Sequence, residues 1–159
     1  MSHVSLIKLR RESPRHSAPS RYSLPQGRRS THFPQRVKLA ARTRAGDGDP
    51  YMARCEWCHV WLGRDGGEVR RRVADGSTYP VLTSVANAVL LCGNRNEGCS
   101  RKAARREFEA EAGGWFIRGG EGPEHDPRRV PVLVSLDGST VFRWLSEDGR
   151  YAAQAPAGG

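Results

Sequence analysis

The pattern of apolar and polar positions divides the chain near residue 53. Residues 1–50 hold no apolar repeat of helical or strand period that lasts for two turns, and they are rich in Arg, Ser, Pro and Gly. Such a segment buries too little apolar surface to offset the entropy of ordering its backbone, so we expect an irregular arm. From Ala53 onward, apolar runs alternate with turn residues, which predicts one compact unit.

Within that unit, three patterns predict a short strand, a buried segment and a hairpin. Residues 68–73 alternate weakly between apolar and charged side chains, as a short strand does. Residues 85–91 form a continuous apolar run, which predicts a buried segment. Two β-rich runs, residues 130–136 and 140–145, lie on either side of Asp137-Gly138, which predicts a β-hairpin.

One helix is predicted between the apolar run and the hairpin. Ser100 is a suitable N-cap, and Ala104 and Phe108 are spaced to share one helical face. Gly113 and Gly114 supply the stop. The chain is therefore expected to divide into an arm (residues 1–50), a core (51–118), a linker with a hairpin packed on that core (119–151) and a tail (152–159).

The charge is concentrated in the arm. The 159 residues carry a formal net charge of +9, and residues 1–50 account for 11 Lys and Arg against 3 Asp and Glu. Such an arm could neutralise phosphates in a salt-dependent way, or it could be a solvated tail without a partner. Met52 is also a possible start of translation, in which case the arm would not be part of the protein. Arg outnumbers Lys by 23 to 3, which partly reflects codon usage in a G+C-rich genome and weakens any argument from arginine chemistry.

Several function classes are excluded or disfavoured by composition. No run approaches the ~18 apolar residues of a membrane span, so we expect no membrane partner and a cytoplasmic location. With 37% hydrophobic residues, 18 Gly and 10 Pro, the core should be small. In a reducing compartment, four cysteines are better explained as metal ligands than as disulfides.

The cysteines predict a structural zinc site. Two residues separate the first pair and six separate the second, and Gly93 and Gly98 inside the second pair would let that loop close. Four thiolates complete a tetrahedron and leave no position for water, so this zinc would not be catalytic. His59 could replace one thiolate, or the cysteines could be buried small hydrophobes. The expected ligands are Cys55, Cys58, Cys92 and Cys99.

Four segments of the chain together resemble the HNH endonucleases carried by actinobacteria and their phages. They are CEWCHVWLG, VRRRVADG, ANAVLLCGNRNEGC and GGWFIRGGEGPEHDPRRVPVLV, and the resemblance covers residues 54–151. It implies a small α+β domain stapled by zinc. In its ββα-metal core, a hairpin and one following helix hold a divalent ion against a DNA backbone, and a C-terminal hairpin completes the domain.

The resemblance also implies that the catalytic residues are mostly replaced. The paired histidines of the family, a metal ligand and the general base, fall on Arg70 and Arg71, and the last metal-binding histidine falls on Ser100. The family asparagine is retained as Asn87. An arginine keeps its proton and has no lone pair for a metal or a proton, so we expect a catalytically impaired protein.

Alternatives to an impaired nuclease remain open. Asp75 is the best substitute metal ligand, with His59 and His125 as further candidates, and a rescued site would make the chain an active Mg- or Mn-dependent DNA endonuclease or nickase. A protein-interaction adapter, or the product of a decayed mobile gene, is a second alternative.

Binding without cleavage is the function expected first. Positive side chains could replace the charge of the lost cation at a surface that faces phosphate, holding nucleic acid, expected to be DNA, with little sequence preference. The tryptophans at 57, 61, 115 and 144 could stack on bases or form core. The residues expected to bind are Arg70, Arg71, Arg72, Arg101, Lys102, Arg105 and Arg106.

Overall fold

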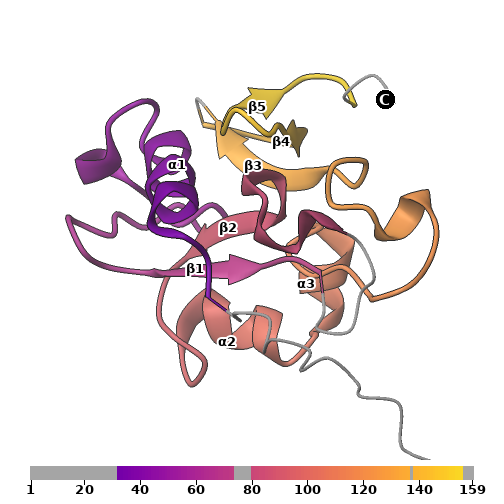
Figure 1. Cartoon of the computed structure of the whole chain (residues 1–159). Helices are drawn as coiled ribbons and strands as arrows, with labels where there is room; N and C mark the ends of the chain where they lie inside the picture. Colours follow the sequence, from indigo (N-terminus) through magenta and orange to yellow (C-terminus); the bar gives the residue numbers. More distant parts are fainter. Residues whose placement is uncertain (1–31, 74–79, 137, 156–159) are drawn as a thin grey trace, which may run out of the picture. The chain divides into compact units, whose positions relative to one another are not determined.

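The computed structural model describes residues 32–73, 80–136 and 138–155, and the substitute ligand Asp75 and most of the expected arm lie outside them. The described chain is a small α+β structure with two small antiparallel sheets and few helices (Figure 1). In chain order, the helices and strands are α1 (Gln35–Ala45), β1 (Glu68–Arg71), β2 (Ala88–Leu91), α2 (Gly98–Ala104), α3 (Phe108–Ala112), β3 (Val132–Leu136), β4 (Ser139–Leu145) and β5 (Tyr151–Ala152). Single 3-10 turns occur at Pro50–Met52, Pro80–Thr83, Val85–Asn87 and Pro123–His125.

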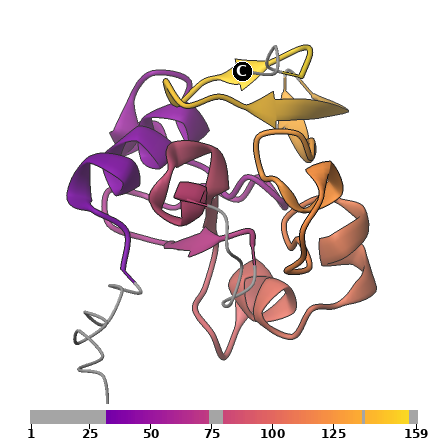
Figure 2. The same ribbon diagram turned by 45° about the vertical axis from the view of Figure 1, so that its right-hand side comes forward.

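The first sheet pairs β1 with β2 and is covered on both faces. Every residue of β2 is buried, which confirms the buried run expected there. Successive side chains of a strand point to opposite faces. Ala88 accordingly packs with Val37 and Ala41 of α1, whereas Val89 and Leu91 join the main core on the other face. Figures 1 and 2 show the ribbon of β1 and β2 with α1 and α2 close to it.

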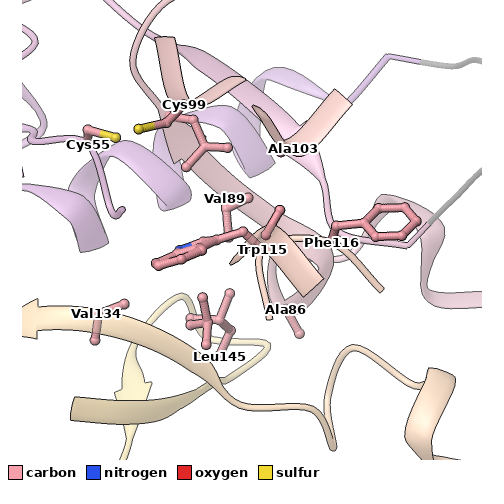
Figure 3. Packing of buried hydrophobic residues seen from close by; sticks show 12 residues of the cluster. Cys55, Ala86, Val89, Cys99, Ala103, Trp115, Phe116, Val134 and Leu145 are labelled. Carbon is pink, nitrogen blue, oxygen red and sulfur yellow. The ribbon is translucent and has the colours of Figure 1, made fainter. Parts of the chain in front are cut away.

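The main core is centred on an aromatic residue that follows α3. Figure 3 shows Trp115 between Val89 on one side and Val134 and Leu145 on the other. The ring of Trp115 stacks on Trp57, with ring centroids 4.2 Å apart. The core therefore ties the second sheet to the first and to the cysteine segment.

The predicted C-terminal hairpin is confirmed. β3 and β4 are antiparallel, with Val132 opposite Arg143 and Leu136 opposite Ser139, and β5 adds a third strand. Gly138 adopts a φ of 78° at the turn, a conformation that glycine takes without strain. The expectation of a short strand over residues 68–73 is likewise confirmed by β1, which ends at Arg71.

The expectation of an irregular arm up to residue 50 is wrong for its last part, because α1 is a helix packed on the core. Val37 and Ala41, one turn apart, are buried against Ala88. Arg44 lies on the same buried face and pairs with Glu56. A stripe of two small apolar residues and one arginine is too narrow to stand out in the sequence. A chain that began at Met52 would lack α1 altogether.

The single helix expected after the cysteines is instead two short helices. The chain breaks between α2 and α3, where Arg106 has a φ of 56°. Ser100 is not an N-cap: it lies inside α2 and is buried, and Glu97 occupies the cap position. Phe108 is 83% exposed and shares no buried face with Ala104, although Gly113 does end α3 as expected. Within the described segments, no helix is both long and apolar enough to cross a membrane.

Candidate functional site

The four cysteines converge on one point. The sulfur atoms of Cys55, Cys58, Cys92 and Cys99 all lie within 4.8 Å of one another, and Cys58 Sγ is 3.6 Å from Cys92 Sγ. Tetrahedral zinc with Zn–S bonds near 2.3 Å requires sulfur atoms about 3.8 Å apart. Figure 3 shows the sulfurs of Cys55 and Cys99 directed toward each other. This cluster could hold a metal ion such as zinc, and it is the only group of three or more His, Cys, Asp or Glu in the described residues that could do so.

A tight loop brings the two cysteines of the second pair together. The loop of the second pair closes through Gly93 and Gly98, which have φ values of 75° and 66°. A Cβ at Gly93 would lie 2.3 Å from the carbonyl oxygen of Glu97, so only glycine fits there. The amide of Cys99 points at the sulfur of Cys92 at 3.4 Å, as amides do around metal-bound thiolates. His59 is exposed and takes no part in the cluster.

The electrostatics of the cluster favour one thiolate. A hydrogen bond with the Cys99 thiol lowers the pKa of Cys55 to about 5, against the opposing effect of burial. The same hydrogen bond raises the pKa of Cys99. The thiolate is the form that binds soft metal ions. Burial also raises the pKa of Cys58. The cluster therefore stabilises the thiolate of Cys55, and a metal ion would have to displace the protons of Cys58 and Cys99.

A buried ion pair holds this cluster to α1 and to the end of the chain. Glu56, next to Cys55, accepts hydrogen bonds from Arg44 Nε at 2.9 Å and from the amide of Leu90 at 2.6 Å. The hydroxyl of Tyr151 also donates to Glu56, at 2.5 Å. Burial, together with the charge of Glu56, raises the pKa of Tyr151 well above its usual value, so the phenol stays neutral and donates. The acid fixes the position of the cysteine turn from three directions.

The three consecutive arginines after Val69 occupy three different environments. Arg70 points toward α2, where its guanidinium donates to Ser100 Oγ at 3.3 Å. It also donates to Oε2 of Glu68, on its own strand, at 3.2 Å. Ser100 also donates to Glu68. Arg71, on the opposite face of β1, lies over the Phe33 ring at 5.6 Å. The strand alternation thus gives Arg70 and Arg71 different neighbours, although both side chains also line the basic groove beside β1.

Arg72 is not a surface residue, which corrects the expectation that it contacts nucleic acid directly. Its side chain is 0% exposed. Burial lowers the pKa of Arg72 to about 9, which leaves the guanidinium charged at neutral pH. It donates to five main-chain carbonyl oxygens, those of Ala86, Gly114, Pro127, Val130 and Pro131.

Asn87 is fully buried and braces the segment that precedes β2. Its side-chain oxygen accepts from the amide of Val73 at 2.9 Å, and its amide nitrogen donates to the carbonyl of Leu82 at 3.1 Å. His125 lies elsewhere: it contacts the carbonyl of Arg118 and the carboxylate of Glu124 and belongs to neither the cysteine cluster nor the groove described next.

A basic groove of about 1070 Å³ lies beside β1, between the start of α1 and the end of α2. Seven cationic side chains with exposed surface line it, against the two carboxylates of Asp65 and Glu68. Three of the seven were expected from the sequence, namely Arg70, Arg71 and Arg106. The four that sequence reasoning missed are Lys38, Arg42, Arg64 and Arg95.

The remaining expected binding residues are outside the groove. Arg101, Lys102 and Arg105 are exposed or partly exposed on α2 and its C-cap but do not line the groove. Lys102 instead lies over the Trp57 ring at 5.3 Å. The cations of α2 therefore do not line the groove that the cations of β1 line.

Comparison with known proteins gives no family assignment: no family model matches the chain, and neither a curated protein nor a solved structure matches it. Functional inference therefore depends on the residues and geometry described above.

Proposed function

We propose that this chain is a nucleic-acid-binding protein on an HNH-endonuclease-like frame, which holds a phosphate backbone and does not cut it. The observation that carries the proposal is the groove beside β1, where seven cationic side chains face two carboxylates. A concave surface with such an excess of positive charge attracts a polyanion and releases its counterions. We expect the ligand to be DNA, bound through its backbone with little sequence preference.

The order of the elements supports the HNH-like frame. The antiparallel pair of β1 and β2 is followed by α2; the first cysteine pair lies before β1, and of the second pair Cys92 follows β2 while Cys99 lies in the first turn of α2. Arg70 and Ser100, 30 residues apart, meet at 3.3 Å. The resemblance places metal-binding histidines at these two positions, and such ligands would have to lie close together.

The chemistry of these replacements argues against cleavage. Metal-assisted hydrolysis requires ligands with free lone pairs and a base that activates water. The guanidinium of Arg70 has no lone pair and would repel a divalent cation, while the nearby Glu68 carboxylate already accepts from both Arg70 and Ser100. An active Mg- or Mn-dependent nuclease is therefore the second candidate.

We propose that the cysteine cluster is a structural metal site. A zinc ion held by Cys55, Cys58, Cys92 and Cys99 would have four sulfur ligands and no site for water, so it would be structural.

A pair of matched double variants tests the groove. Lys38→Ala/Arg95→Ala removes two groove cations, and Arg101→Ala/Arg105→Ala removes two exposed cations outside it. We measure the affinity for a labelled DNA by fluorescence anisotropy across a salt series. The groove variant should weaken binding about tenfold and reduce the slope of log K against log salt by about 2, whereas the other should change neither by as much.

The same protein is incubated with supercoiled plasmid and magnesium, manganese or nickel. Nicking that disappears in Ser100→Ala would overturn the claim that the protein does not cut, and it would favour the nuclease candidate. No salt-sensitive binding by the intact protein would refute the binding function and favour the adapter alternative.

A further inference from the structure

Exposed large apolar side chains are concentrated in the segment that holds the first cysteine pair. Seven large hydrophobic residues of the described chain are exposed, and four of them fall within residues 51–61. Single exposed hydrophobic residues are ordinary, whereas a concentration of them in one segment calls for an explanation. The four are Tyr51, Met52, Val60 and Trp61.

The structure distinguishes the tryptophans that the sequence could not. Trp115 is buried, Trp57 stacks on it, and Trp144 donates its indole N–H to the carbonyl of Arg129 at 2.9 Å. Trp61 is the exception, with 59% of its surface exposed. It is the tryptophan whose ring can meet a ligand.

The exposed rings adjoin the basic groove. Arg64 lines the groove, and its guanidinium lies 5.4 Å from the centre of the Tyr51 ring. Arg42, another groove residue, donates to the carbonyl oxygens of Gly63 and Arg64 at 2.7 Å each, which fixes the turn between groove and rings. A Cβ added at Gly63 would lie 3.7 Å from the Trp61 ring, so this ring packs against the same turn.

We propose that the nucleic acid held by this site is single-stranded, with its phosphates in the groove and its unpaired bases stacked on Trp61 and Tyr51. This inference rests on the proposed nucleic-acid-binding function and names its substrate class. In a duplex, the base faces are hidden within the stack, so exposed aromatic rings beside a cationic groove recognise unpaired bases. Arg64 over Tyr51 provides a second planar surface that can join such a stack.

The charge near the rings fits a polynucleotide better than an apolar protein segment. Arg54 is paired through the backbone with Trp61, opposite it in a β-bridge, and is itself exposed. Arg64 is exposed in the turn that follows Trp61 and lies over the Tyr51 ring. Each exposed ring thus has an arginine close to it that can contact the phosphates next to a stacked base.

The test compares an oligodeoxyuridylate and an oligouridylate of about 12 nucleotides with a DNA duplex of the same length, all end-labelled. Binding to the full chain is followed by anisotropy, and stacking is followed by quenching of tryptophan fluorescence. We expect the single strands to bind at least about tenfold more tightly than the duplex. Trp61→Ala and Tyr51→Ala should each weaken single-strand binding by about tenfold and leave duplex binding nearly unchanged, whereas the control Phe108→Ala, at another exposed aromatic, should change neither.

The outcomes separate this inference from the function on which it rests. Equal affinity for single strand and duplex, with salt dependence retained, would overturn single-strand recognition while leaving nucleic-acid binding intact. So would a loss in Trp61→Ala no greater than that in Phe108→Ala. If neither form binds, both proposals fail. The two single strands show whether the sugar is recognised, because only RNA carries the 2′-hydroxyl.

Discussion

At the scale of the residue, Arg72 shows how far a charge in this small protein can be from solvent. Its five hydrogen bonds reach carbonyls before β2, after α3 and before β3. These carbonyls lie outside the α-helices and strands. The guanidinium therefore supplies hydrogen-bond donors to several loops at once. Removing the guanidinium alone would leave these buried carbonyls without a donor, which is costly in free energy.

Arg72→Met should therefore be far more damaging than the same change one residue earlier. We expect the free energy of unfolding to fall by about 3 to 5 kcal/mol, because several carbonyls would be left buried without a donor. Arg71→Met, on a partly exposed side chain, should cost about 1 kcal/mol or less. Urea unfolding of both variants measures this, and equal losses would contradict the structural role assigned to Arg72.

At the scale of the element, α1 contributes a buried arginine as well as an apolar stripe. Arg44 donates to both carboxylate oxygens of Glu56 and, at 2.6 Å, to the carbonyl of Ala88. Its pKa is raised, because the attraction and hydrogen bonds of Glu56 outweigh the effect of burial. The helix is thus attached to the same carboxylate that orients the first cysteine turn.

Replacing Arg44 should detach α1 from the core. Arg44→Met leaves the Glu56 carboxylate buried and unpaired, which should cost about 3 to 5 kcal/mol. Arg36→Met, an exposed position on the same helix, provides the control and should change stability by less than about 0.5 kcal/mol. The double variant Arg44→Met/Glu56→Leu should recover part of the loss, and a loss equal to the sum of the two single changes would argue against a coupled pair.

At the scale of the whole molecule, the cysteine cluster joins two turns that are 33 residues apart along the chain. The main core includes Cys55 and Cys99 themselves, so the cysteine cluster and the core are one structure. In small domains of this kind, metal binding supplies much of the folding free energy, on the order of 10 kcal/mol for zinc-finger peptides. The fold should depend on the ion.

Cys92→Ser should accordingly lose the metal and cooperative folding together. We expect the zinc content to fall from one ion per chain to a small fraction and the thermal unfolding transition to broaden or disappear. His59→Ala should keep both, since that side chain is outside the cluster. Atomic absorption and calorimetry give the two readouts. Loss of zinc in His59→Ala would restore histidine as a ligand, and a sharp transition in metal-free protein would show that the core suffices alone.

Much of the local structure was predictable, because it depends on neighbours in the chain. The period-2 pattern of residues 68–73, the apolar run before Cys92 and the turn at Asp137-Gly138 led to β1, β2 and the β3–β4 hairpin. The spacing of the cysteines predicted a cluster, and their sulfurs do converge. In each case, the signal and the structure involve the same few residues.

The sequence by itself determined the cysteine cluster, the strands and the excess of positive charge. Only the tertiary structure decided which charges face a ligand. Arg70, Arg71 and Arg72 look equivalent in the sequence, yet Arg70 and Arg71 line the groove whereas Arg72 is buried among main-chain carbonyls. The groove also draws Lys38 and Arg95 from distant segments. The physical reason is that a sequence gives the number of charges in each segment, whereas a binding surface is formed by side chains that packing brings together from distant segments.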